Sequence, residues 1–212
     1  MITIKEPMQS EIVEKKSKFI ANIYYVESVD EAENKIKEAK KKYHDARHNC
    51  SCYRVLEEGK IVEKSSDDGE PSGTAGGPML NILQKKKLVN IVVIVTRYFG
   101  GILLGTGGLV RAYSDVTQKA IEEAEKISVI LGKEYEVKLN YSELEKLKYY
   151  AKLNDINIIN TKFENEIICY LQIPNEKISG FIGDIEKKNL NILEYKEICE
   201  KYILSKKIGQ FS

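Results

Sequence analysis

Apolar and polar positions along residues 1–130 alternate in patterns that predict an α+β fold. Residues 10–26 alternate with a period of two, which is typical of two short antiparallel strands. Residues 28–43 repeat apolar positions at helical spacing, and Ser28 and Glu31 form a capping box at the start of that helix. The pattern then predicts a hairpin over residues 48–66 that turns near Glu58 and Gly59, a short helix over 76–86, a buried strand over 87–99 and a long helix over 108–126.

A second pattern starts near residue 131 and repeats the mixture of strands and helices. Ser142 and Glu145 form another candidate capping box. The predicted elements follow the order β-α-β-β-α-β, which is the ferredoxin-like motif. They are a strand over 134–141, a helix over 142–154, a strand pair over 156–173, a helix over 175–189 and a strand over 190–198. We therefore predict two domains, residues 1–130 and 131–212.

The composition is that of an ordinary globular protein. Of its 212 residues, 42% are hydrophobic and 31% are charged, and the net charge is +1. A charge so near zero argues against the electrostatic binding of nucleic acid by a wholly basic domain, but it leaves a local basic patch open. The longest apolar runs are far shorter than a membrane span, and the charged first residues do not resemble a signal peptide. We expect a cytoplasmic protein with no membrane partner, and the cysteines lack the spacing of a disulfide framework.

Most of the glycines lie in two clusters, one within residues 69–77 and one within 100–108. Glycine clusters cost backbone entropy, so a tight turn or a close backbone approach should offset that cost. The second cluster lies between a strand and a helix, which would leave amides near Gly107 and Gly108 unpaired at a positive helix end, with Arg111 one turn further on. This arrangement favours an anion site. The alternative, that the glycines only allow close helix packing, stays equally open.

All four arginines fall in the same region as the glycine clusters, whereas lysine is the usual cation elsewhere. A guanidinium is a planar fork with several donors, which suits phosphate or carboxylate groups. We interpret this concentration as a hint of anion recognition. The four are Arg47, Arg54, Arg97 and Arg111.

Familiar nucleotide and metal motifs are absent. Gly105 is followed by Thr106 and Gly107, not by the Lys-Ser/Thr of a P-loop, and Val110 occupies the position of the last Rossmann glycine. The acidic residues within 67–70 could hold a hard cation, but an exposed acidic turn is commoner. His48 and Cys50 form neither a zinc knuckle nor a convincing nucleophile–base pair. We predict no metal, no cofactor and no catalytic set.

Four segments resemble signature segments of the IMPACT family in its bacterial, YigZ-like form. They are "SKFIA", "DARHNCSCY", "DDGEPSGTAGGPML" and "VVIVTRYFGGILLGTGGLVRAYSD". The resemblance implies a first domain with the fold of the second domain of ribosomal protein S-five, and a ferredoxin-like second domain. It also implies association of bacterial members with RNA or ribosomes, whereas eukaryotic members compete for a ribosome-associated activator of an initiation-factor kinase. Arg47 stands where many relatives have threonine.

We interpret the chain as a non-enzymatic, translation-associated regulatory protein that binds RNA or ribosomes through the glycine segments and arginines. One alternative is an enzyme or binding protein for a small phosphorylated or nucleotide ligand, with Asp68, Glu70 and His48 as acid–base candidates. Another is a module that docks a translation factor or ribosome-associated protein without nucleic acid. The predicted ligand-binding residues are Arg47, His48, Asp68, Gly69, Glu70, Ser72, Gly73, Thr74, Gly76, Arg97, Tyr98, Gly100, Gly101, Gly105, Gly107, Gly108 and Arg111.

Aromatic residues near the second cluster could stack on bases. These are Tyr98, Phe99 and Tyr113. We expect core packing for at least two of them.

Overall fold

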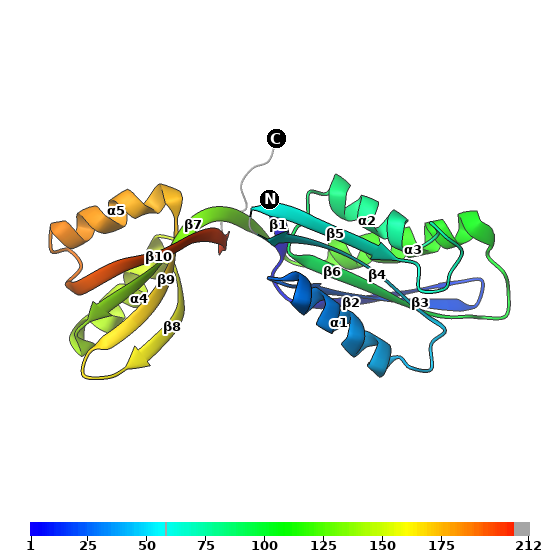
Figure 1. Cartoon of the computed structure of the whole chain (residues 1–212), viewed down its shortest axis with the longest axis horizontal. Coiled ribbons are helices and arrows are strands. Elements are labelled where there is room, and N and C mark those ends of the chain that lie inside the picture. Colours follow the sequence, from blue (N-terminus) through cyan, green and yellow to red (C-terminus); the bar gives the residue numbers. More distant parts are fainter. Residues whose placement is uncertain (58, 206–212) are drawn as a thin grey trace. The chain divides into compact units, whose positions relative to one another are not determined.

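A computed structural model describes residues 1–57 and 59–205, which fall into two compact units (Figure 1). The first unit is Met1–Lys126 and the second starts at Ile127. Each unit has its own hydrophobic core. No helix within the described ranges is both long and apolar enough to cross a membrane.

The first unit contains a five-stranded antiparallel sheet in the order β2-β3-β6-β4-β5. Its central strand, β6, is buried from Ile91 to Arg97, which explains why its sequence reads as a nearly continuous apolar run. A short strand, β1 (Ile2–Ile4), forms a parallel bridge with Leu88. The sheet strands are β2 (Met8–Glu14), β3 (Ser17–Tyr25), β4 (His48–Glu57), β5 (Lys60–Ser66) and β6 (Ile91–Tyr98).

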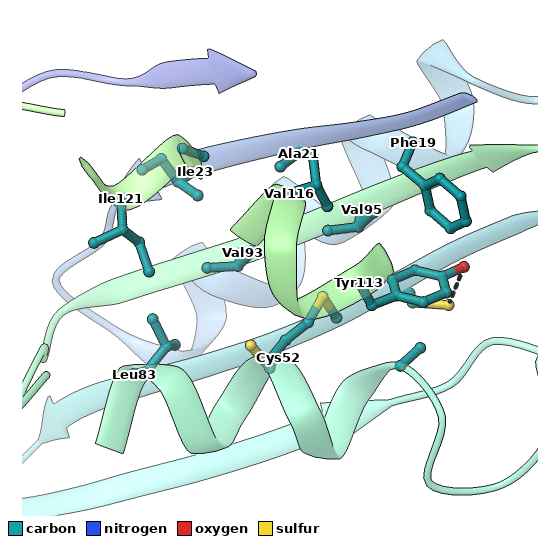
Figure 2. Close-up of a cluster of buried hydrophobic side chains, with 14 of the residues drawn as sticks. Phe19, Ala21, Ile23, Cys52, Leu83, Val93, Val95, Tyr113, Val116 and Ile121 are labelled. Carbon is teal, nitrogen blue, oxygen red and sulfur yellow. Dashed lines mark hydrogen bonds between the residues drawn. The ribbon is translucent and has the colours of Figure 1, made fainter. Parts of the chain in front are cut away.

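Helices cover both faces of this sheet because alternate residues of β6 point to opposite sides. Val92 and Ile94 pack with α1 (Val29–Lys42), whereas Val93 and Val95 pack in the cluster under α2 (Gly76–Lys85) and α3 (Gly105–Glu123). Figure 2 shows this second cluster, in which Phe19 meets Tyr113 edge to face with ring centroids 5.1 Å apart.

The second unit is an antiparallel sheet with its strands in the order β10-β7-β9-β8. Counted along the chain, this order is 4-1-3-2, the ferredoxin-like arrangement. Phe181 of α5 and Leu147 of α4 are buried in its core. The elements are β7 (Lys126–Leu139), a 3₁₀ turn (Tyr141–Glu143), α4 (Leu144–Leu153), β8 (Asn157–Phe163), β9 (Ile167–Pro174), α5 (Asn175–Glu186) and β10 (Ile192–Ser205).

The α+β class, the predicted helices and the capping box at Ser28 are confirmed: the Ser28 side chain accepts the Glu31 amide at 3.1 Å. The second capping box is wrong, because a 3₁₀ turn covers Ser142 and Glu143 precedes α4 without a side-chain cap. Helix α3 begins at Gly105, three residues earlier than predicted. Of the predicted hairpin turn, Glu58 lies outside the described residues.

Strand β7 is longer than predicted because Gly132 interrupts the apolar pattern without ending the strand. A side chain there would come within 2.7 Å of the Ile173 carbonyl oxygen and 2.5 Å of Ile203. The glycine therefore permits close packing inside the strand.

Candidate functional site

A groove of about 420 Å³ lies in the first unit, where both glycine segments meet the end of the sheet. Arg47 and His48 come from the start of β4, and Arg97 and Phe99 come from the end of β6. The loop before α2 contributes Gly69, Glu70 and Pro71, and the segment that enters α3 contributes Leu103, Leu104, Gly105, Thr106 and Leu109. The groove therefore brings together two loops that are about thirty residues apart in the sequence.

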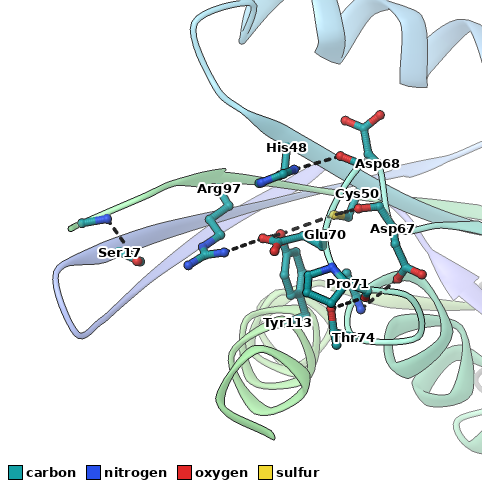
Figure 3. Close-up of polar contacts among 12 residues, drawn as sticks. Ser17, His48, Cys50, Asp67, Asp68, Glu70, Pro71, Thr74, Arg97 and Tyr113 are labelled. Atoms are coloured by element: carbon teal, nitrogen blue, oxygen red, sulfur yellow. Dashed lines mark hydrogen bonds and ion pairs between the residues drawn. The ribbon is translucent and has the colours of Figure 1, made fainter. Parts of the chain in front are cut away.

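A buried ion pair forms the floor of this groove. Nη1 of Arg97 donates to Oε1 of Glu70 at 2.7 Å, and the two side chains are only 7% and 3% exposed. The Tyr113 hydroxyl donates to the same oxygen at 2.9 Å (Figure 3). A buried charge is tolerable only when it is paired and hydrogen-bonded, and these contacts satisfy that need for Glu70.

Arg97 itself is only partly satisfied. The guanidinium carbon lies 5.4 Å from the Phe19 ring centroid and 5.5 Å from the Phe99 centroid, within the range of cation–π contacts. Its Nε is buried and has no hydrogen-bond partner among the described residues. The Arg97 guanidinium is therefore held in place by these contacts, while Nε–H has no acceptor among the described residues.

Cys50 and Tyr113 are buried beside the ion pair. The Cys50 thiol donates to the Asp67 carbonyl at 2.9 Å and lies 3.3 Å from the Tyr113 hydroxyl. Burial raises the pKa of Cys50 to about 12, and burial also raises the pKa of Tyr113 far above its ordinary value. Both groups are neutral near pH 7, so Cys50 is not an activated nucleophile.

Asp67 organises the first glycine loop. One carboxylate oxygen accepts the amides of Ala75 at 3.0 Å and Gly76 at 2.9 Å, and the other accepts the amide of Gly73 at 2.8 Å. Helix α2 has no capping side chain at Ala75 itself, so Asp67 serves as a distant cap. Partial burial opposes ionisation, but the three amides outweigh it and lower the pKa of Asp67. The amides of Gly73, Ala75 and Gly76 are therefore already bound to the Asp67 carboxylate.

Asp68 is also engaged within the protein. Its carboxylate accepts the Asn49 amide at 2.7 Å and the Lys40 ammonium at 2.6 Å. Its carbonyl oxygen accepts Nδ1–H of His48 at 2.9 Å, which leaves Nε2 of His48 free for another partner. Within residues 1–57 and 59–205, no group of three His, Cys, Asp or Glu side chains is placed to hold a metal.

The N-terminus of α3 differs from that of α2 because no carboxylate occupies it. The first turn of α3 contains no acidic residue, and Leu104 precedes it without a side-chain cap. Gly105 has a φ of +74°, a conformation that favours glycine. The partial positive charge of a 19-residue helix is thus directed at the groove wall.

The predicted residues are only partly brought together. Arg47, His48, Gly69, Glu70, Arg97 and Gly105 line the groove, and Arg47 is exposed without a hydrogen-bond or ion-pair partner among the described residues. Arg54 instead pairs with Glu63 at 2.6 Å. The predicted residues outside the groove lining are Asp68, Ser72, Gly73, Thr74, Gly76, Tyr98, Gly100, Gly101, Gly107, Gly108 and Arg111.

Several of these outlying residues have structural contacts that explain their positions. The Thr74 hydroxyl donates to the Pro71 carbonyl, and Tyr98 donates to Asp45 at 2.9 Å. A side chain at Gly76 would lie 2.6 Å from the Ser66 nitrogen, so glycine permits a close approach there. Arg111 is exposed and lines a smaller neighbouring pocket.

The sequence analysis missed the apolar wall. Phe99 is 49% exposed and Leu103 is 83% exposed, whereas Tyr113 is fully buried and Tyr98 is half-buried. Core packing is therefore right for Tyr113 and wrong for Phe99. The signal that could have found this wall is the apolar "FGGILLG" between a strand and a helix, where a loop would ordinarily be polar.

The Impact N-terminal domain matches residues 15–121, which is half of the chain. The chain belongs to the IMPACT family. IMPACT family member YvyE of Bacillus subtilis is 42% identical over 146 residues, covering 69% of this chain and 67% of that protein. IMPACT family member YigZ of Escherichia coli is 32% identical over 187 residues, covering 86% and 92%. The matched IMPACT domain contains every residue that lines the groove.

A solved structure extends this likeness across both units of the IMPACT chain. The crystal structure of a hypothetical protein is 28% identical, with a TM-score of 0.61, and covers 93% of this chain and 96% of that one. The similarity to a eukaryotic IMPACT protein covers a smaller part of the chain. Protein IMPACT of Rattus norvegicus is 35% identical over 98 residues, which is 44% of this chain and 30% of that protein.

Proposed function

We propose that this IMPACT family member is a translation-associated regulatory protein that binds RNA or the ribosome through the groove at the start of α3. One observation carries the proposal: Arg47, His48 and Arg97 converge beside a helix N-terminus that no carboxylate occupies. Helix amides and guanidinium forks are the groups that hold phosphate in proteins. Membership of the family supports the link to translation.

The charges around the groove favour an anion despite three nearby carboxylates. Three amides stabilise the charge of Asp67, Lys40 and an amide bind Asp68, and Arg97 and Tyr113 bind Glu70. Arg47 and the spare donors of Arg97 lack such partners among the described residues. The charged side chains that line the groove are Arg47, Arg97 and Glu70, which sum to a formal charge of +1.

A binding role accords better with these contacts than a catalytic one. Asp68 and Glu70 are both engaged by hydrogen bonds within the protein, and Cys50 is a neutral buried thiol. A general base needs a free oxygen or nitrogen within reach of its substrate, whereas both oxygens of Asp68 accept hydrogen bonds and Oε1 of Glu70 accepts two. His48 combines a place in the groove with a ring nitrogen, Nε2, that has no hydrogen-bond partner among the described residues.

The proposal is tested by measuring binding to ribosomal RNA fragments and to isolated ribosomes over a salt series. The test variant is Arg47→Ala/Arg111→Ala, because both side chains are exposed. The matched control, Lys37→Ala/Lys146→Ala, removes two exposed cations that are not among the residues lining the groove. We expect salt-sensitive binding whose log–log slope falls by about 1.5 in the test variant and is unchanged in the control.

Absence of binding to RNA and ribosomes by the unaltered protein would contradict the proposal. Binding to ribosomes that survives nuclease and has no salt dependence would point to a protein partner on the ribosome instead.

A further inference from the structure

The lining of the groove combines two kinds of chemistry. Arg47, His48 and Arg97 supply polar donors, whereas Phe99, Leu103 and Leu109 supply apolar surface. A bare phosphate would use the polar donors and leave the apolar surface uncovered. A ligand that fills both needs an anionic group attached to a flat, weakly polar group.

The donors of Arg97 define where the anionic group binds. Nη1 is occupied by Glu70, so the free edge of the guanidinium is the one formed by Nε and Nη2. Nε is buried and has no hydrogen-bond partner among the residues that the structure describes, and the Arg97 side chain is more than nine-tenths buried. An unsatisfied buried donor is rare in a native protein, and this edge matches two oxygens of a phosphate. This edge is therefore the candidate position for an anion, in a groove that the start of α3 also lines.

Phe99 connects this site to the apolar wall. Its ring lies 5.5 Å from the Arg97 guanidinium carbon, and about half of its surface faces solvent. A base stacked on that ring would lie one side chain away from the phosphate, which is the spacing within a single nucleotide. The bases of a duplex are stacked on each other and cannot reach such a ring, whereas an unpaired base can.

We propose that the groove receives one unpaired nucleotide of an RNA single strand, with its phosphate on Arg97 and Arg47 and its base on Phe99 and Leu103. The inference rests on the proposed function, because it specifies the form of RNA that binds. A volume of about 420 Å³ suits one nucleotide and is too small for a helical segment. A free mononucleotide carries the same chemistry, so the experiment must separate the two sources.

The test uses the full chain and fluorescence anisotropy with three labelled probes. These are a mixed-sequence 12-nucleotide RNA single strand, a fully paired duplex of that sequence, and the same strand with abasic sites. The variant is Phe99→Ala, the conservative variant is Phe99→Tyr, and the control is Tyr149→Ala, which removes a different exposed aromatic ring. Circular dichroism and thermal melting of each variant establish that it is folded.

We expect the single strand to bind at least tenfold more tightly than the duplex or the abasic strand. Phe99→Ala should abolish that preference without changing duplex affinity, whereas Phe99→Tyr and Tyr149→Ala should retain it. Equal affinity for the single strand and the duplex, unaffected by Phe99→Ala, would overturn this inference and leave the proposed function intact. Absence of binding to every RNA probe would overturn this inference, and the proposed function would fall with it only if ribosomal RNA fragments and isolated ribosomes also fail to bind.

Competition identifies the source of the nucleotide. If the strand is the ligand, a mononucleotide such as AMP should displace it only at millimolar concentration. Displacement by micromolar AMP, lost in Phe99→Ala, would overturn the assignment to an RNA strand and identify a free nucleotide as the ligand.

Discussion

Arg97 and Glu70 form a buried ion pair, with Nη1 and Oε1 2.7 Å apart, that joins the end of the central strand to the first glycine loop. The pair explains how two distant glycine segments come to line one groove. It also gives Arg97 two roles. Its Nη1 atom binds Glu70, whereas its Nε atom has no acceptor among the described residues. Stability and binding at this residue can therefore be separated by experiment.

Removing one member of the pair should destabilise the protein strongly. Arg97→Met leaves Glu70 as a buried carboxylate without its cation, and we expect a loss of about 3–5 kcal/mol in the free energy of unfolding measured with urea. The double variant Arg97→Met/Glu70→Gln removes both charges and keeps an acceptor for Tyr113, so it should recover much of that loss. Lys138→Met, which breaks the exposed pair with Glu194, should have little effect. Similar small losses in Arg97→Met and Lys138→Met would show that the buried pair is not a structural element.

Asp67→Asn should make the first glycine loop less stable and change its response to acid. An amide cannot accept all three backbone N–H groups as a carboxylate does, so we expect a loss of about 1–2 kcal/mol at pH 7. The folded-state pKa of Asp67 is lowered, so its contribution is complete above the unfolded-state pKa, near 4, and disappears as the pH falls through the folded-state value. The difference between variant and wild type in urea unfolding should therefore shrink from pH 7 towards pH 2. A difference that is constant over this range would contradict the assigned role.

The cysteines should differ sharply in reactivity. Burial raises the pKa of Cys50 to about 12, whereas Cys199 on β10 is exposed. Because the thiolate is the reactive form, iodoacetamide at pH 8 should label Cys199 readily and Cys50 only after unfolding. Peptide mass spectrometry of native and urea-treated protein measures this. Rapid labelling of Cys50 in the native protein would show that its environment is more open than described.

Two glycines in the second cluster should respond oppositely to alanine. A side chain at Gly100 would lie 2.0 Å from the Lys16 backbone, so Gly100→Ala should destabilise the protein by about 1–3 kcal/mol. Gly107 lies in the first turn of α3 with open space around it, so Gly107→Ala should stabilise the protein by up to about 1 kcal/mol. Thermal melting of the two variants provides the comparison. Destabilisation by Gly107→Ala would mean that the helix start requires glycine there.

The sequence predicted the elements well where periodicity was long, as in β6 and α1, because burial on one or both faces leaves a regular apolar pattern. It placed the start of α3 too late, at Gly108, because Gly105 and Gly107 looked like loop residues although both lie within the helix. The sequence indicated which segments contribute to the candidate site, but it did not indicate what the individual residues do there. Arg97 was predicted as a ligand-binding residue, but its buried pairing was not predicted, because Glu70 is 27 residues away and nothing local links the two. Asp67 was passed over for the same reason, since a cap that acts across a loop has no fixed spacing.

The most direct test of Arg97 as a phosphate-binding residue is the affinity of the double variant Arg97→Met/Glu70→Gln for single-stranded RNA, measured over a salt series beside the wild type. The net charge of this variant equals that of the wild type, so a general change in the protein's charge does not enter the comparison. We predict binding at least tenfold weaker and a log–log salt slope smaller by about one, in a protein that circular dichroism shows to be folded. A folded double variant that binds RNA with the affinity and salt slope of the wild type would contradict the assignment of the groove as a phosphate site.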